Sequence, residues 1–279
     1  MRVVRAGALT TVQDLGRPGY AHLGVPRSGA LDGPALRRAN ALVGNPPGAA
    51  GLETTLTGCA FRLVADGTIA VTGATARVRV DGAEVGPDEA VEVPAGALVD
   101  VGRATAGVRS YVAVAGGLDV PPVLGSRSTD TLSGLGPPRL RDGDLLRVGS
   151  PVGAVARLKA TPPAPAEIVL PVVLGPRHDW FTAEAVETLL TTAYAVSPQS
   201  NRVGARLAGA ALARADAGEL PSEGVVLGAV QVPADGQPLV FLADHPTTGG
   251  YPVIAVVTDV TALAQARPGS TVRFHGPER

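Results

Sequence analysis

Short runs of alternating apolar and polar residues, separated by glycine, proline and aspartate, dominate the chain from Thr68 onward. One set of runs lies at residues 69–72, 76–80, 97–101, 110–114 and 144–148, and a second set lies at residues 167–174, 238–243, 252–258 and 270–274. Alternation puts every second side chain of a strand on the same face, and the intervening turn residues allow neighbouring strands to run antiparallel. The pattern predicts a mainly β, or β-dominated α+β, fold arranged as a sandwich or a barrel.

The length and one composition shift predict two domains. The 279 residues are enough for one large or two medium domains with proper cores. Residues 151–166 are rich in proline and alanine and contain few large apolar side chains, which is typical of a linker. We therefore predict an N-terminal β domain at residues 1–150, a linker at residues 151–166 and a C-terminal β domain at residues 167–279.

Three short helices are predicted between the strands. The first begins near Asp32, with a proline in its first turn, and stops at Gly44. The second starts at Thr182, and the third covers residues 261–266 before a proline ends it.

Composition excludes several classes of function. The formal net charge of −1 and the pI near 6.4 give no overall field that would attract nucleic acid or an anionic membrane. The chain has no apolar run of membrane-spanning length and no signal-peptide core, so we expect a cytoplasmic protein. Cys59 is the only cysteine, and the four histidines lack metal-ligand spacing, so neither a disulfide nor a metal site is expected.

Lys159 is the only lysine, which limits the possible cofactor chemistry. A Schiff base or a phosphate-binding loop would need this residue, yet its surroundings lack the glycine-rich P-loop pattern. We expect this chain alone to bind no cofactor, any ATP to be bound by a partner protein, and any biotin to be carried by a separate protein.

A polar, glycine-punctuated run, T-T-V-Q-D-L-G-R-P-G-Y, lies at Thr10 to Tyr20. Arg17 offers a planar cation that can grip a carboxylate with two parallel hydrogen bonds, Gln13 offers an amide, and Asp14 offers a carboxylate that could move protons. The alternative is a solvated turn in which Asp14 and Arg17 pair.

Two further candidates surround the first predicted helix. Ser28 precedes the helix start, where free backbone N–H groups could cradle an anion, although Asp32 as a simple N-cap explains the same pattern without a ligand. Asn40, inside the helix, is a candidate for substrate binding, with an exposed helical asparagine as the alternative.

The remaining candidates lie further along the chain. Arg127 and Arg202 stand among small polar residues, either as further anion clamps or as interface residues. Glu223 is a candidate general acid or base, and Gln231 and Gln237 could bind an amide or lactam. Asp235 and Gly236 alone would indicate a hairpin turn. Hydroxyls and backbone N–H groups for developing negative charge could come from a last polar run that holds Thr247, Thr248, Gly250 and Tyr251.

These segments carry a resemblance to a known family. The segments are T-T-V-Q-D-L-G-R-P-G-Y, V-P-R-S-G-A-L-D, A-N-A-L-V-G-N, G-S-R-S-T, S-E-G-V-V-L-G-A-V-Q-V-P-A-D-G-Q-P and H-P-T-T-G-G-Y-P. In this order, from Leu9 to Phe274, the chain resembles the family called allophanate hydrolase subunit 2, Kip A-like protein, biotin-dependent carboxyltransferase or 5-oxoprolinase C subunit. The resemblance implies two cyclophilin-like β-barrel domains. One departure lies near Pro137, where the family usually has a glycine-rich stretch.

The resemblance implies three functions, ranked by their fit to the polar residues. The first is one subunit of an ATP-dependent 5-oxoprolinase, a hydrolase of a cyclic amide, acting with a Kip I-like (B-subunit-like) protein and a lactam-utilisation (A-subunit-like) protein. An arginine would hold the substrate carboxylate, Gln13 or Gln231 the lactam, and Asp14 or Glu223 would move protons. The second is carboxyl transfer from biotin on a separate carrier to a urea-like or amide substrate. The third is a non-enzymatic, Kip A-like antagonist of a kinase inhibitor.

Overall fold

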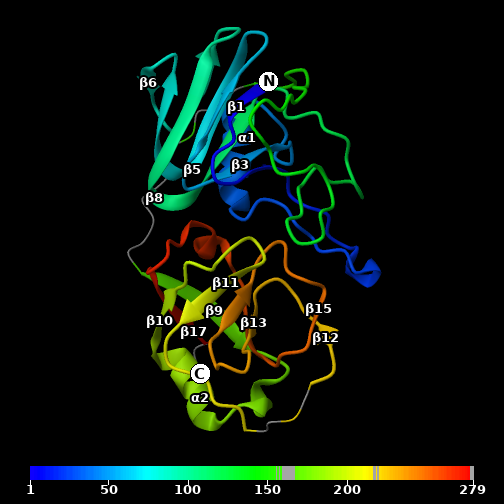
Figure 1. The fold of residues 1–279 in the computed structure, drawn as a ribbon, viewed down its shortest axis with the longest axis vertical. Coiled ribbons are helices and arrows are strands. Elements are labelled where there is room, and N and C mark those ends of the chain that lie inside the picture. Colours follow the sequence, from blue (N-terminus) through cyan, green and yellow to red (C-terminus); the bar gives the residue numbers. More distant parts are fainter. Residues whose placement is uncertain (155, 157, 159–166, 216–217, 219, 277–279) are drawn as a thin grey trace. The chain divides into compact units, whose positions relative to one another are not determined.

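The computed structural model describes residues 1–154, 156, 158, 167–215, 218 and 220–276, and the chain divides into two compact units (Figure 1). Unit 1 comprises Met1–Arg17 and Ser28–Ala164, and unit 2 comprises Pro18–Arg27 and Pro165–Arg279. The sequence-based division kept residues 18–27 in the N-terminal domain, whereas they group with unit 2. Most of the predicted linker, with Lys159, lies outside the described residues.

Unit 1 is a half-barrel of antiparallel strands. Its strands are β1 (Arg2–Arg5), β2 (Thr10–Gln13), β3 (Gly51–Thr55), β4 (Cys59–Arg62), β5 (Gly67–Val80), β6 (Ala83–Val85), β7 (Val91–Val93) and β8 (Leu98–Val114). The sheet order is β1-β4-β8-β3-β2, and β5 pairs with β6, β7 and β8. The two long strands β5 and β8 pair from Ile69 opposite Val114 to Val80 opposite Val99, with register shifts between Gly73 and Val78.

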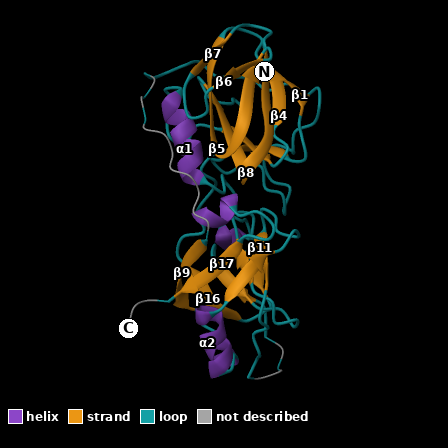
Figure 2. Ribbon diagram, turned by 90° about the vertical axis from the view of Figure 1, so that its left-hand side faces the viewer, coloured by secondary structure: helices purple, strands orange, loops and turns teal. Residues whose placement is uncertain are grey.

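The alternation in these strands builds the core of unit 1. The inward side chains of β4, β5 and β8, such as Phe61, Ile69 and Val101, are fully buried in one apolar cluster. Helix α1 (Gly33–Leu42) packs Leu36 and other apolar residues against the opposite face of β5 and β8, where it forms a second cluster (Figure 2). The first predicted helix is confirmed.

Unit 2 is a closed seven-stranded barrel. Its strands follow the order β10-β11-β14-β13-β16-β9-β17, and β17 closes on β10. The strands are β9 (Ile168–Leu174), β10 (Ala193–Val196), β11 (Gly204–Ala208), β13 (Ala229–Gln231), β14 (Leu239–Phe241), β16 (Val253–Val257) and β17 (Thr271–His275). A separate two-stranded sheet pairs β12 (Glu223–Gly224) with β15 (Thr248–Gly249).

The helices of unit 2 are short. Helix α2 (Ala183–Thr191) begins after Thr182, as predicted, and the remaining turns are the 3-10 helices η1 (Ala21–Leu23), η2 (His178–Trp180) and η3 (Thr261–Gln265). The third predicted helix is the 3-10 helix η3, in which the Leu263 N–H donates to the Val260 carbonyl (3.0 Å) and the Ala266 N–H donates to the Leu263 carbonyl (3.3 Å). Strands dominate both units, which confirms the mainly β class.

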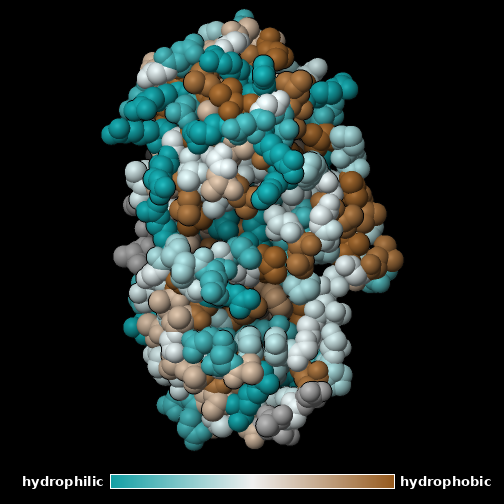
Figure 3. Space-filling view, viewed as in Figure 1, coloured by the Kyte–Doolittle hydropathy of each residue, from teal (hydrophilic) through white to brown (hydrophobic). Residues whose placement is uncertain are grey.

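The surface is of mixed polarity, and the helices are short. On the face seen in Figure 3, hydrophobic residues form several small patches interspersed with hydrophilic ones. Among the described residues, no helix is both long and apolar enough to cross a membrane.

Candidate functional site

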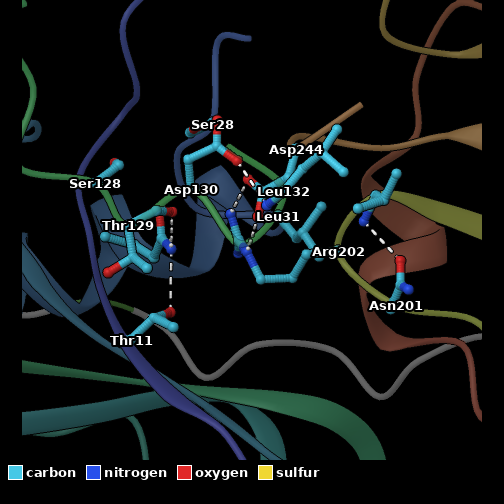
Figure 4. A network of polar contacts seen from close by, with 12 residues as sticks. Thr11, Ser28, Leu31, Ser128, Thr129, Asp130, Leu132, Asn201, Arg202 and Asp244 are labelled. Atoms are coloured by element: carbon cyan, nitrogen blue, oxygen red, sulfur yellow. Dashed lines mark hydrogen bonds and ion pairs between the residues drawn. The ribbon is translucent and has the colours of Figure 1, made fainter. Parts of the chain in front are cut away.

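The first polar run forms a buried cluster in unit 1, at the end of β2. Gln13 ends β2, Arg17 lies in the turn that follows, and their side chains are 0% and 1% exposed. The segment at residues 126–130 lies against this turn, because the Asp14 N–H donates to Ser128 Oγ (3.0 Å) and the Thr129 N–H donates to the Val12 carbonyl (2.9 Å). Figure 4 shows Ser28, Ser128, Thr129 and Asp130 gathered in this region with Thr11. We call Gln13, Arg17, Ser28, Thr129 and Asp130 the Arg17 site.

The Asp14 carboxylate holds two loops of this cluster together. Its Oδ1 accepts hydrogen bonds from the Gly16 N–H (2.7 Å), Ser126 Oγ (2.6 Å) and Ser128 Oγ (2.6 Å), and its Oδ2 accepts one from the Arg127 N–H (2.6 Å). Both oxygens are therefore occupied by groups of the protein itself. A role of Asp14 in proton transfer stays a prediction, and the geometry favours a positioning role.

Arg17 is a buried cation whose partners are all neutral. Its Nη1 donates to Ser28 Oγ (3.0 Å), its Nε donates to the Val123 carbonyl (3.3 Å), and its Nη2 donates to the Ser128 carbonyl. Within the described part of the chain it forms no ion pair, so the predicted pairing with Asp14 is wrong. Two of its five N–H donors have no acceptor among these residues. A buried, unpaired charge is costly, so this geometry suits an anionic ligand.

Three buried acceptors without a partner belong to the same site. Gln13 Nε2 donates to Thr11 Oγ1 (3.0 Å) and to the Thr129 carbonyl (3.0 Å), which leaves Gln13 Oε1 without a hydrogen bond. Thr129 Oγ1 and Asp130 Oδ2 are also buried without a partner. Buried polar atoms are nearly always hydrogen-bonded in folded proteins, so these unsatisfied atoms, in the same cluster as a cation that lacks a carboxylate partner, indicate a ligand site.

The start of α1 is capped by Asp32 and lies beside the site. Asp32 Oδ1 accepts from the Ala35 N–H (2.9 Å), which confirms the N-cap interpretation. Ser28 has a positive φ of 51°, and Gly29 (φ 95°) lies so close to Gly16 that an added Cβ would meet the Gly16 nitrogen at 2.8 Å. This tight approach brings the Ser28 hydroxyl to Arg17.

Asn40 is neither exposed nor open to a ligand. Its side chain is 0% exposed, and its Nδ2 donates to the Ala49 carbonyl (2.8 Å), while its Oδ1 accepts from Asn45 Nδ2 (3.1 Å). The alternative interpretation, an exposed helical asparagine, is therefore wrong. Asn40 instead ties the end of α1 to the loop that follows.

The other two candidate arginines differ from Arg17. The Arg127 side chain is 37% exposed, its Nε donates to the Val120 carbonyl (2.8 Å), and its Nη2 lies 3.6 Å from Asp119 Oδ1. Arg202 in unit 2 is buried and forms a bidentate pair with the equally buried Asp244, with both N–O distances at 2.9 Å. Unlike Arg17, each of these arginines therefore has a carboxylate within ion-pair distance, a closely bound one at Arg202 and a more distant one at Arg127.

In unit 2, Glu223 on β12 is paired with Arg177. Arg177 Nε donates to Glu223 Oε2 (3.0 Å), and a second hydrogen bond joins Arg177 Nη2 to Oε1. The hydrogen bonds from Arg177 lower the pKa of the Glu223 carboxyl. Glu223 is thus held ionised near neutral pH, a state that suits a base better than an acid.

The two candidate glutamines of unit 2 bond to backbone groups. Gln231 is buried, and its Nε2 donates to the Tyr251 carbonyl (2.9 Å). Gln237 braces Gly209 from both sides, because its Oε1 accepts from the Gly209 N–H (2.8 Å) and its Nε2 donates to the Gly209 carbonyl (3.2 Å). The predicted turn at Asp235 and Gly236 is confirmed by the Gly236 N–H bond to the Pro233 carbonyl (3.1 Å) and by a φ of 74° at Gly236.

The last polar run lies beside Glu223. Thr248 and Gly249 form β15, in which Gly249 is opposite Glu223. Thr247 is half-buried and Gly250 is exposed, while Tyr251 is partly exposed with the Arg214 guanidinium 5.9 Å from its ring centre. The fold thus brings Glu223, Gln231 and this run together within unit 2.

Sequence reasoning missed Thr129, Asp130 and the buried carboxylate of Glu53. Glu53 Oε2 accepts from the Tyr111 hydroxyl (2.8 Å) and from the Leu31 N–H (3.0 Å). Burial raises the pKa of Tyr111 well above its ordinary value, so this hydroxyl stays a donor. Glu53 lies in the strand G-L-E-T-T, whose sequence gives no signal for this contact, because Tyr111 is 58 positions away.

The described residues contain no group of three histidine, cysteine, aspartate or glutamate side chains that could hold a metal ion. Cys59 is buried, and burial raises the pKa of its thiol to about 12, so the thiol is protonated and unreactive in the folded chain.

Comparison with known proteins identifies relatives over nearly the whole chain. The family model of the carboxyltransferase domain, subdomain A and B, matches residues 23–276. The C subunit of 5-oxoprolinase from Escherichia coli (strain K12) is 40% identical over 283 residues, which cover 98% of this chain and 90% of that protein. Urea amidolyase of Saccharomyces cerevisiae is 33% identical over 305 residues, which cover 98% of this chain but 16% of the yeast enzyme.

A solved structure agrees with these relatives. The crystal structure of the K. lactis urea amidolyase matches with a TM-score of 0.89 and 32% identity over 98% of this chain and 18% of that one. The relatives are thus parts of enzymes, and the chain spans about a sixth of the urea amidolyases. The chain belongs to the carboxyltransferase domain family, subdomain A and B, as the resemblance of its polar segments predicted.

Proposed function

We propose that the chain is one subunit of an ATP-dependent 5-oxoprolinase and that its Arg17 site holds 5-oxoproline while the ring is opened to glutamate. Support comes from the 40% identity to the C subunit of the E. coli 5-oxoprolinase over 98% of this chain. The observation that carries the proposal is the buried guanidinium of Arg17, which has no carboxylate partner in the described part of the chain.

The substrate's two polar groups fit the two kinds of group in the site. Its carboxylate would accept two hydrogen bonds, from the two N–H groups of Arg17 that have no acceptor among the described residues. Such bidentate binding favours arginine over lysine. Its lactam would lie against the side-chain amide of Gln13. Asp14 would position the loops of the Arg17 site.

The reaction would be shared between several proteins. Opening 5-oxoproline consumes ATP and water and gives glutamate, ADP and phosphate, and this sequence has no phosphate-binding loop pattern. We therefore assign ATP to a partner and expect the active complex to contain a Kip I-like (B-subunit-like) protein and a lactam-utilisation (A-subunit-like) protein.

The test is ATP-dependent glutamate release from 5-oxoproline by the three mixed proteins, with each omitted in turn. Arg17→Lys keeps the positive charge but loses the two parallel N–H donors of the guanidinium. We therefore expect KM for 5-oxoproline to rise by about tenfold or more, with a smaller change in kcat. Arg147→Lys is the matched control, because Arg147 is 86% exposed and pairs only weakly with Asp119. No release by folded, associated partners would overturn the proposal.

A second candidate is carboxyl transfer from biotin on a separate carrier to a urea-like or amide substrate. It is favoured by the match of residues 23–276 to a carboxyltransferase domain model and by the similarity to urea amidolyase. The same Arg17 site would then hold the carboxylate of carboxybiotin. The discriminating measurement is loss of labelled carboxyl from a carboxylated biotin carrier when the chain and urea are added, which the oxoprolinase proposal does not predict.

A further inference from the structure

We propose that Asp130, together with Gln13 and Thr129, makes the Arg17 site selective for a ligand that presents an N–H group, as a cyclic amide does, and that Asp130 is the specificity-determining residue. This inference rests on the proposed function, because it concerns the same site. It adds one requirement, a ligand N–H group, which the binding of a carboxylate alone does not impose. The site would reject a carboxylate of the same shape that lacks the N–H.

The orientation of the Asp130 carboxylate is fixed by its own loop. Its Oδ1 accepts from the Leu132 N–H (2.8 Å) and from the Ser133 N–H (3.0 Å), and the Asp130 N–H donates to the Leu135 carbonyl (2.9 Å). These bonds turn Oδ1 toward the loop and leave Oδ2 without a partner, although the residue is 1% exposed. Such an atom is preorganised to accept one further hydrogen bond.

The other two atoms lie on the neighbouring groups. Gln13 Nε2 is 3.0 Å from the Thr129 carbonyl, so the Gln13 amide lies against the residue that precedes Asp130. Gln13 Oε1 and Thr129 Oγ1 are, like Asp130 Oδ2, buried and unsatisfied. Gln13 Oε1 is an amide oxygen and Asp130 Oδ2 is a carboxylate oxygen, so both accept hydrogen bonds and a ligand satisfies them by donating.

The cation is connected to this acceptor set through Ser128. Arg17 Nη2 donates to the Ser128 carbonyl, which directly precedes Thr129 and Asp130 in the chain. Arg17, a donor for an anion, and Gln13, an acceptor for an N–H, thus both contact the short segment that carries Thr129 and Asp130. A small molecule with both a carboxylate and an amide N–H matches this arrangement, whereas a plain carboxylate satisfies only half of it.

The test compares two probes that differ in one atom. 5-Oxoproline carries a ring N–H, and 5-oxotetrahydrofuran-2-carboxylate replaces that N–H with an ether-type oxygen while keeping the carboxylate and the carbonyl. Binding of each is measured by isothermal titration calorimetry on the full chain and on its mixture with the two partner proteins. We expect the unaltered chain to bind the lactam at least about tenfold more tightly than the lactone.

Asp130→Asn tests the assignment without changing shape. Because two backbone N–H groups hold Oδ1, the oxygen of the asparagine must stay on that side, and its NH₂ group then takes the place of Oδ2. The acceptor becomes a donor, so the lactam preference should fall by about tenfold or reverse. Thr129→Val, which keeps the backbone bonds of Thr129, provides a second variant should the asparagine variant fail to fold. Asp179→Asn, at an exposed aspartate of unit 2, is the matched control.

The outcomes separate this inference from the function on which it rests. Failure of the unaltered chain to bind either probe, alone and in the mixture, would overturn the substrate assignment and the inference with it. Equal binding of lactam and lactone would overturn the N–H selectivity alone and leave carboxylate recognition by Arg17 standing. A lactam preference that survives both Asp130→Asn and Thr129→Val would remove these residues from the recognition of the N–H.

Discussion

Individual side chains in the Arg17 site and around it divide into groups that hold the loops and groups that are left open. Asp14 belongs to the first class, because four protein donors occupy its two oxygens. Arg17, Gln13 and Asp130 belong to the second, because each keeps a buried donor or acceptor without a protein partner among the described residues. Burial of such atoms has a free-energy cost that a bound ligand removes, so the open atoms are better guides to function than the satisfied ones.

Replacing Asp14 by asparagine should destabilise unit 1 by about 2–4 kcal/mol, because hydrogen bonds to a charged group are strong and the new NH₂ group would face donors. Urea denaturation followed by far-ultraviolet circular dichroism measures the loss. Asp66→Asn is the control, since Asp66 is exposed and accepts one hydrogen bond, from the Ala95 N–H (2.8 Å). A stable Asp14→Asn protein that has lost a limb of its pH–rate profile would instead identify Asp14 as a proton carrier.

At the scale of elements, the sequence predicted the features that depend on neighbouring residues, namely where helices begin and end and where strands lie. The N-cap residues Asp32 and Thr182 start α1 and α2, where each accepts a hydrogen bond from the N–H three residues on. Gly44, with a φ of 71°, follows the end of α1, as expected for a residue that must adopt a left-handed conformation. Alternation predicted strands, because half-buried strands require it, but not their length: the runs at residues 69–72 and 76–80 form the single strand β5, and the runs at residues 97–101 and 110–114 lie along β8, which begins at Leu98.

The candidate site was only partly predictable, because its contacts are not local. Gln13 and Arg17 were found from their own segment, but the partner of Gln13, the Thr129 carbonyl, is 116 positions away. Asp130 lies in a loop whose sequence gives no periodic signal, and its free Oδ2 follows from how that loop folds on itself. Asn40 was a plausible binding residue until the fold placed its amide against the Ala49 carbonyl.

The loop after Asp130 offers a test of how strongly one element supports the site. Gly134 and Gly136 both have a positive φ, 77° and 81°. A Cβ added at Gly136 would meet the Ser128 carbonyl oxygen at 2.1 Å and Arg17 Nη2 at 3.2 Å. A Cβ added at Gly134 would meet nothing within 4 Å. Both alanine variants carry the backbone strain of a left-handed residue. We expect Gly136→Ala alone to weaken 5-oxoproline binding, by about tenfold, in a calorimetric titration. Equal losses in both variants would mean that only loop strain matters.

At the scale of the whole chain, each unit has its own apolar core. The half-barrel of unit 1 buries its core around Phe61 and Val99, with α1 covering a second cluster. The barrel of unit 2 buries a separate cluster around Phe241 and also packs Tyr194 edge-on against Phe274, with ring centres 5.9 Å apart. Units with separate cores can unfold in separate steps, because the cooperative contacts lie within each unit.

The two helix caps and the single tryptophan provide a way to measure this independence. Trp180 lies in unit 2, so its fluorescence reports on the barrel. Thr182→Ala removes the cap of α2 and should lower the free energy of unfolding in the fluorescence-detected urea transition by about 1 kcal/mol. Asp32→Ala removes the cap of α1 in unit 1 and should leave that transition unchanged while shifting the one seen by circular dichroism. Equal shifts of the fluorescence transition by both variants would show that the two units unfold as one. Damage to either core would then abolish the Arg17 site of unit 1 and the Arg177–Glu223 ion pair of unit 2 together.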